Sequence, residues 1–246
     1  MFVAPGEDVL PFVPAVMERV QALMHTDDPH LREPVLSVVA SVAASAEGHF
    51  APHAEALLPL MPHLMAASGP GAPEVRARAT ECAGLLLSCL GPDRAVTLAQ
   101  EPARVALQAL ASTSSHELRE YCFGFFGQLA EAAPALAGDV LAAVLPAALA
   151  ATEQDDGAPT RVGPGGGGRG GGAGESSGAE GSDSDDEDDS ALQLAAVRTG
   201  LVEEKCAATQ CIGKLAGAAG AAFGPSLPAA CRAVEAMCGH FHEEVR

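Results

Sequence analysis

Four short segments of one kind recur along this chain, each joining a polar turn to an apolar run. Three of them carry an arginine at the same place, Arg32, Arg76 and Arg119, separated by 44 and 43 residues, and the fourth lies at 242–246. A period of this length is typical of stacked helix pairs of the HEAT or armadillo kind. The spacing therefore predicts a repeat protein.

The composition favours an extended all-α fold over a globule. The 246 residues include one Tyr, no Trp and eight Phe, so few bulky groups are available to fill a deep core. Small and γ-branched side chains suit helices that pack closely side by side, and a solenoid needs only a thin core between neighbours. We expect a HEAT-repeat α-solenoid, a superhelix of antiparallel helix pairs.

The apolar periodicity predicts four helix pairs and the start of a fifth. Proline and turn residues mark the ends of the helices. The expected first helices are 8–24, 50–67, 92–111, 138–151 and one that begins at 223; the expected second helices are 31–46, 74–90, 117–132 and 192–215.

An insertion divides the fourth pair and so divides the chain. Residues 1–152 should hold about three and a half repeats, and 192–246 should continue them. Between them, 153–191 joins a glycine-rich tract at 163–174 to the like-charge run Asp183–Asp189, and neither composition can form a packed core. We expect a disordered loop here, and a fragment of a longer solenoid truncated at both ends, because an incomplete last pair leaves an apolar face uncovered.

Half of the excess negative charge is concentrated in this insertion. The net charge is -18, and from Glu153 to Ser190 eleven acidic residues stand against two arginines. Such a tract repels nucleic acid phosphates and attracts basic proteins. Ser182 and Ser184 each have an acid three residues on, so an acid-directed kinase should modify them and strengthen that attraction.

Other classes of site are not favoured by the sequence. The seven cysteines lie mostly in apolar runs, as buried thiols of a reducing compartment do, and the cluster Cys238, His240 and His242 lacks a fourth metal ligand. The glycine tract lacks the lysine of a phosphate loop and follows a helix. We expect no metal, no cofactor and no catalysis. The acidic residues are concentrated in the expected loop, where the fixed geometry that general acid-base catalysis needs cannot be maintained.

Neither a signal peptide nor a membrane span is expected. The first residues lack a basic segment followed by an apolar core, and the longest apolar run, 140–151, is broken by Pro146. These features predict an intracellular protein without membrane insertion.

Several segments resemble the importin-beta (karyopherin-beta) family of nuclear transport receptors, nearest to its importin-4 and importin-5 branch. The run 118–130, LREYCFGFFGQLA, resembles the second helix of a central repeat, and 199–210, TGLVEEKCAATQ, resembles the helix that follows the family's acidic loop. The Phe-x-Pro segments beginning at Phe50 and Phe223 resemble its first-helix starts. The likeness extends over nearly the whole chain, including the position of the insertion.

The resemblance implies a receptor that carries basic cargo such as histones or ribosomal proteins, releases it on binding Ran-GTP, contacts the Phe-Gly repeats of nuclear pores, and shuttles between cytoplasm and nucleus. In that family the second helices line the concave surface, and the acidic loop contacts cargo or Ran. Carried over by position, the loop residues are Asp183, Asp185, Asp186, Glu187, Asp188 and Asp189, and the concave-face candidates are Glu81, Glu120, Glu203 and Glu204.

Two other classes of function remain open at this point. A HEAT-repeat scaffold of a multiprotein complex would show the same helices without any response to Ran. An acidic histone chaperone would need only the acidic loop. Ordinary solvated helix faces also explain each of the four glutamates taken singly.

Overall fold

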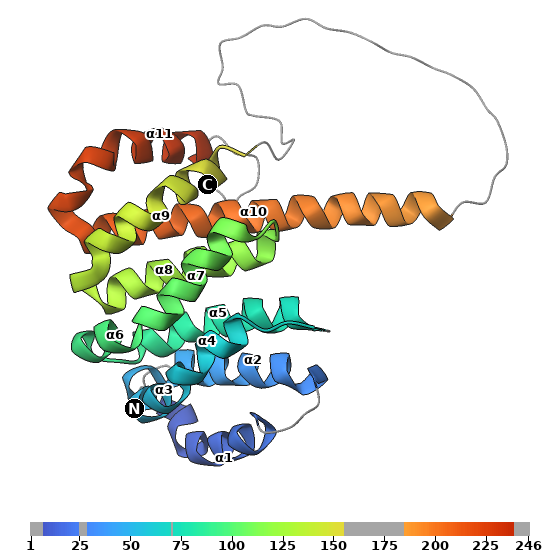
Figure 1. Cartoon of the computed structure of the whole chain (residues 1–246), viewed down its shortest axis with the longest axis vertical. Helices are drawn as coiled ribbons and strands as arrows, with labels where there is room; N and C mark the ends of the chain where they lie inside the picture. The colour runs from blue at the N-terminus through green and yellow to red at the C-terminus, as the bar shows by residue number, and fades with distance from the viewer. Residues whose placement is uncertain (1–6, 25–28, 70, 155–184, 239–246) are drawn as a thin grey trace, which may run out of the picture.

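The computed structural model describes residues 7–24, 29–69, 71–154 and 185–238, with the backbone alone for 7, 29 and 185–198. The described residues are almost entirely helical and contain no β-strand. Consecutive helices pack in pairs, and the pairs stack along the long axis of the molecule (Figure 1). The predicted α-solenoid is confirmed.

One layer consists of the first helix of each pair, and prolines divide several of these helices. Pro59 and Pro62 break the second one, because a proline ring removes a backbone donor and clashes with the preceding turn. The helices are α1 (Val13–Met24), α3 (Ala51–Leu57), α4 (Met61–Met65), α6 (Pro92–Leu98), α7 (Gln100–Ser112), α9 (Ala137–Thr152) and α11 (Leu227–Cys238). Short 3₁₀ turns join them: η1 (Glu7–Phe12), η2 (Glu47–Phe50), η3 (Leu58–Leu60), η4 (Pro134–Leu136) and η5 (Gly220–Ser226).

The second helices form the other layer, and each packs against the one before it. They are α2 (Pro29–Ala46), α5 (Ala72–Ser88), α8 (His116–Ala132) and α10 (Asp185–Ala219), stacked in that order. In Figure 1 they run side by side, from α2 in blue to α10 in orange. A polar side chain on one second helix therefore lies within reach of the next, although the two are about one repeat apart in the sequence.

The core is a seam between the two layers. Three of its four bulkiest fully buried members are in α8, Phe123, Phe125 and Phe126, and the last two rings meet edge to face at 5.1 Å between centroids. Ser115 caps this helix by accepting a hydrogen bond from the backbone amide of Leu118. Burial of each phenyl ring stabilises the fold by roughly 2–3 kcal/mol.

Glycines let the second helices approach closely at two points. A Cβ on Gly84 would lie 3.2 Å from the Phe125 backbone and closer still to the Gln128 amide oxygen. A Cβ on Gly127 would lie 2.8 Å from Cδ of Lys214, on α10. The spacing of α5, α8 and α10 therefore depends on these two missing side chains.

Helix α10 begins earlier than the sequence analysis expected. Its backbone is helical from Asp185, whereas the predicted loop extended to residue 191. A helix of 35 residues is about 50 Å long, and its first turns project beyond the neighbouring helices (Figure 1). Acidic residues in a first turn complement the helix dipole, which favours this early start. The remainder of the insertion, 155–184, lies outside the described residues.

Segment 134–152 corrects one sequence expectation. By length and composition alone, η4 and α9 together are long and apolar enough to cross a membrane, and 44% of the window is buried inside the fold. One such segment is weak evidence for a span, since a core helix passes the same test. Helix α9 packs against α8 and α10.

Candidate functional site

Acidic side chains gather on the layer of second helices. Glu81 of α5, Glu117 and Glu120 of α8, and Glu203 of α10 are close enough that the other three charges all act on Glu120. We call these four residues the acidic row. It contains three of the four concave-face candidates, Glu81, Glu120 and Glu203, and crosses three successive helices.

Arg78 neutralises one end of the acidic row. Its guanidinium lies 3.0 Å from Oε1 of Glu33 on α2 and 2.5 Å from Oε2 of Glu81, and 5.4 Å from the ring centroid of Tyr121 on α8. Desolvation alone would lower the pKa of Arg78, but the hydrogen bond and charge of Glu81 raise it above its usual value. The arginine therefore stays charged and ties α2, α5 and α8 together.

At the other end of the acidic row, no cation among the described residues forms an ion pair with Glu120 or Glu203. Burial, with the charges of Glu203, Glu117 and Glu81, raises the pKa of Glu120 to about 7, against a smaller opposing effect of Arg78. Near neutral pH this carboxyl is therefore close to half protonated. A second cation beside it would favour the ionised form.

A cavity lies beside these unneutralised carboxylates. It has a volume of about 430 Å³, and its lining comes from α8 and α10. The lining residues are Glu120, Glu203, Cys206, Ala207 and Gln210. These residues provide two carboxyl groups, one amide, one thiol and the methyl group of Ala207.

Glu204 does not belong to this surface, which corrects the sequence expectation. Its side chain is 0% exposed, and its two oxygens lie 2.6 Å from Nδ1 of His116 and 2.6 Å from Nε of Arg119. Arg119 also donates to the backbone oxygen of Leu110 at 2.9 Å. A carboxylate turned inward between α8 and α10 holds the two helices in register and cannot meet a partner.

Gly200 makes the close approach of His116 possible. It lies one helical turn before Glu204 on the same side of α10, and a Cβ there would be 3.3 Å from Cβ of His116. Gln154, two residues after the end of α9, donates a longer hydrogen bond of 3.5 Å to Glu204. The buried carboxylate thus joins both sides of the insertion to α8.

The predicted loop residues are not tested by these contacts. Ser182, Asp183 and Ser184 lie outside the described residues. The others form the first turns of α10, where only the backbone is described: Asp185, Asp186, Glu187, Asp188 and Asp189.

Within the ranges the structure describes, no group of three or more His, Cys, Asp or Glu side chains is placed to hold a metal ion. Of the cluster considered in the sequence, Cys238 is exposed on α11, while His240 and His242 lie outside the described residues.

The sequence analysis missed Glu33, Arg78 and Glu117. A usable signal was present, because Glu33 and Arg78 are 45 residues apart, close to the repeat period. Residues one period apart occupy equivalent places on adjacent second helices, so opposite charges at that separation predict an ion pair between helices.

Taken together, the geometry defines a class of protein: a HEAT-type α-solenoid with acidic side chains gathered on its layer of second helices. No protein-family model matches the chain, and no curated protein matches it.

Solved structures do match. The chain is similar to Kap121p bound to Pho4p, with a TM-score of 0.68 and 15% identity, and to the karyopherin Kap121p bound to the extreme C-terminus of the protein phosphatase Cdc14p, with 0.68 and 14%. It is also similar to Kap121p in a further structure, with 0.65 and 16%. Each match covers 99% of this chain and 22% of the other. The likeness shows a karyopherin-like fold, and the chain spans about a fifth of the length of these proteins.

Proposed function

We propose that this chain is a segment of a karyopherin-type nuclear transport receptor, and that its acidic row binds a basic segment of protein cargo without catalysis. The karyopherin-like fold over 99% of the chain supports the class. The acidic row supports the kind of partner, because several carboxylates on one surface attract lysine and arginine side chains.

The observation that carries the proposal is the pair Glu120 and Glu203. Both line the cavity between α8 and α10, and within the described part of the chain neither has an ion pair. Glu33 and Glu81, by contrast, already have Arg78. Carboxylates that repel one another without a cation gain most when a partner supplies one.

The chemistry of the cavity fits a lysine or arginine side chain. A methylene stem would lie along Ala207, and the charged end would lie between Glu120 and Glu203, with the Gln210 amide as a further acceptor. Arg78 shows the same arrangement within the chain, since it packs on Tyr121 while its guanidinium meets two carboxylates.

The finer features of the proposal rest on the family resemblance. The cargo would be histones or ribosomal proteins, release would follow binding of Ran-GTP, and the receptor would belong near the importin-4 and importin-5 branch. Contact with nuclear pore Phe-Gly repeats and shuttling between cytoplasm and nucleus belong to the same proposal. The acidic segment Asp183–Asp189 would add long-range attraction, strengthened by phosphorylation of Ser182 and Ser184.

A fluorescently labelled histone tail peptide tests the proposed surface. The double variant Glu120→Gln and Glu203→Gln should weaken its binding about tenfold, since partly exposed ion pairs contribute roughly 0.2–1 kcal/mol each. The matched control is Glu18→Gln with Glu101→Gln, which removes two exposed carboxylates of the first-helix layer. Equal weakening by both pairs would show that only net charge matters, and would refute the surface.

The response of the peptide complex to Ran distinguishes a transport receptor from a scaffold. Addition of Ran-GTP to the peptide complex should lower the bound fraction more than the same amount of Ran-GDP. If Ran-GTP and Ran-GDP lower the bound fraction equally, the result favours the scaffold alternative. If a free peptide of 175–189 binds the histone tail as tightly as the whole chain, the result favours the chaperone alternative.

A further inference from the structure

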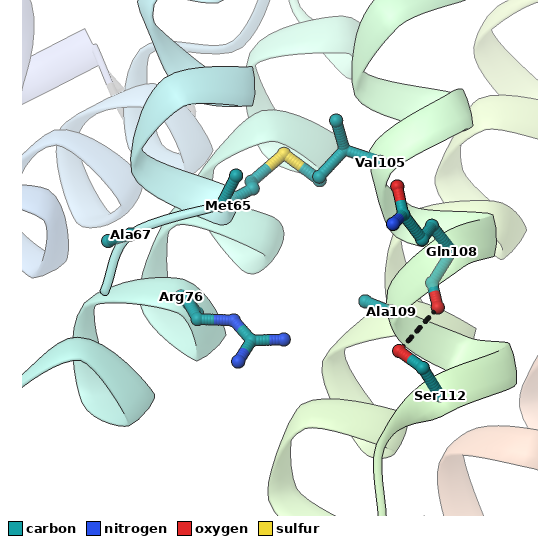
Figure 2. Close-up of a pocket in the computed structure, with 8 residues that line it drawn as sticks. Met65, Ala67, Arg76, Val105, Gln108, Ala109 and Ser112 are labelled. Carbon is teal, nitrogen blue, oxygen red and sulfur yellow. Dashed lines mark hydrogen bonds between the residues drawn. The ribbon is translucent and has the colours of Figure 1, made fainter. Parts of the chain in front are cut away.

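A second pocket lies among the first helices, apart from the acidic row. It has a volume of about 210 Å³ and lies between the end of α4 and the last turns of α7, with Arg76 of α5 at its base. Figure 2 shows the Arg76 side chain extending into this space toward α7, which carries Val105, Gln108, Ala109 and Ser112, with Met65 at one end. The wall formed by α7 carries the apolar side chains of Val105 and Ala109 together with the Gln108 amide and the Ser112 hydroxyl.

Arg76 has no counter-charge among the residues that the structure describes. Its Nε is buried and makes no hydrogen bond, and no carboxylate lies within ion-pair distance of its guanidinium. Arg119, at the same place one repeat later, has both a carboxylate, Glu204, and a backbone oxygen. The two arginines thus occupy equivalent positions in the fold with different surroundings.

The repeat explains the difference. Glu204 directly precedes Lys205 in α10, as Leu118 directly precedes Arg119 in α8. Arg119 receives its carboxylate from α10, the next second helix, whereas no described residue of α8, which follows α5, forms an ion pair with Arg76. A partly buried guanidinium with an unsatisfied donor costs stability, so a ligand that satisfies the donor recovers that energy.

The neighbouring groups cannot substitute for an anion. Burial raises the pKa of the nearby Cys122 thiol to about 12, so this cysteine stays neutral. The hydroxyl of Ser112 donates to the backbone oxygen of Gln108 at 2.8 Å (Figure 2). The pocket therefore has one positive charge and no negative one.

We propose that this pocket binds the carboxylate of an acidic side chain of a partner polypeptide. A planar guanidinium pairs with a carboxylate through two parallel hydrogen bonds, and a single positive charge balances one carboxylate better than it balances a phosphate dianion. The volume is below that of a site for a drug-sized ligand and suits one side chain. Met65, Val105 and Ala109 would contact its methylene stem. The inference is independent of the proposed function, because it uses a different surface and the opposite charge.

The test uses capped pentapeptides with a central glutamate or glutamine between valines, and inorganic phosphate as a separate probe. Side-chain NMR signals of the whole chain report the site: the Nε–H group of Arg76 and the Gln108 amide. The glutamate peptide should shift both signals saturably, with a Kd of roughly 1 mM. The glutamine peptide should bind at least about tenfold more weakly.

Variants link the effect to the guanidinium. Arg76→Gln should abolish the shift of the Gln108 amide, and Arg76→Lys should weaken binding, because an ammonium cannot form the bidentate pair. The control Arg104→Gln removes the same charge from an exposed position on α7 and should bind the glutamate peptide as the unchanged chain does. Thermal unfolding of Arg76→Gln confirms that the variant is folded.

Several results would overturn the proposal. They are equal binding of the two peptides, unchanged binding by Arg76→Gln, a saturable response to phosphate alone, and no saturable shift up to about 10 mM glutamate peptide. Binding of the basic histone tail should be the same in Arg76→Gln and Arg104→Gln. Failure of the Arg76 pocket proposal can therefore be distinguished from failure of the proposed cargo surface at the acidic row.

Discussion

Glu203 and Glu204 are neighbours in α10 yet lie in opposite environments. Glu203 is exposed beside the cavity of the acidic row, while Glu204 is fully buried between His116 and Arg119. The second contact fixes the rotation of α10 about its axis, and that rotation turns Glu203 toward Glu120. The buried ion pair thus positions the surface that we propose for cargo.

Glu204→Ala should destabilise the fold by about 3 kcal/mol, because it leaves the Arg119 guanidinium buried without its partner. Urea denaturation measures the change. The neighbouring variant Glu203→Ala serves as the control and should change the free energy of unfolding by less than about 0.5 kcal/mol, since an exposed carboxylate among like charges makes no pair. Similar losses for the two variants would contradict the assigned orientation of α10.

The contrast between these two glutamates shows how far the sequence alone could go. The 43-residue period and the prolines predicted the helices and their pairing, because both signals are local or strictly repeated. Adjacent helical residues differ by about 100° in direction, so their faces depend on the register of α10 against α8. Arg119 and Glu204 set that register across 85 residues that include the insertion, where the period gives no guidance.

The acidic segment gave a similar partial result. Charge repulsion predicted an unstructured run up to residue 191, but helix α10 continues back to Asp185. Self-repulsion of the carboxylates is opposed by the favourable interaction of acidic residues in the first turns with the helix dipole. Arg76 was recognised only as a marker of the repeat, because the absence of its counter-charge depends on which residue the next helix places opposite it.

Glu120 should make stability fall as pH rises. Its pKa is raised from 4.5 to about 7 in the fold, so between these values the folded state holds more protons than the unfolded state. Its favourable contribution is therefore complete below about pH 4.5 and is lost as pH rises through about 7. Glu120→Gln should show a flatter dependence of unfolding free energy on pH across this window. An unchanged slope would contradict the raised pKa.

The same carboxyl should make binding of a basic peptide pH-dependent in the other direction. A cation between Glu120 and Glu203 favours ionised Glu120, so protonation competes with binding. Affinity for the histone tail peptide should fall by up to about tenfold from about pH 8 to about pH 6. In Glu120→Gln the affinity should be lower throughout and nearly constant in this range, apart from any titration of the peptide itself, which a peptide without histidine avoids.

Arg78 should act as an internal competitor for basic partners. Arg78→Gln frees Glu33 and Glu81 and makes the second-helix face more negative, which should tighten histone tail binding roughly threefold, mostly through faster association. Loss of two partly exposed ion pairs should lower stability by about 1 kcal/mol. Arg94→Gln, which breaks the exposed pair with Glu55, is the control for charge alone. Equal tightening by both variants would argue against a local effect.

Two Gly→Ala substitutions should distinguish the effect of close helix packing on stability from the effect of helix propensity. Gly84→Ala should destabilise the fold by about 1–2 kcal/mol, because its Cβ meets the Phe125 backbone and the Gln128 amide. Gly124→Ala, in exposed space on α8, should stabilise by about 0.5–1 kcal/mol through propensity. Thermal unfolding midpoints that move in the same direction for both would show that α5 and α8 are not in close contact at Gly84.

The acidic segment and the acidic row should contribute to different rates. Replacement of every Asp from 183 to 189 by Asn, with Glu187→Gln, keeps the length of the chain and removes the concentrated charge. Because salt screens exposed charges most strongly, this variant should associate more slowly with a histone tail and with a flatter salt dependence, while its dissociation rate changes little. The pair Glu120→Gln and Glu203→Gln should instead mainly speed dissociation, since short-range contacts are lost. Stopped-flow measurements at two salt concentrations distinguish the two effects. If the neutralised segment leaves association unchanged, its charge makes no contribution to the attraction of cargo.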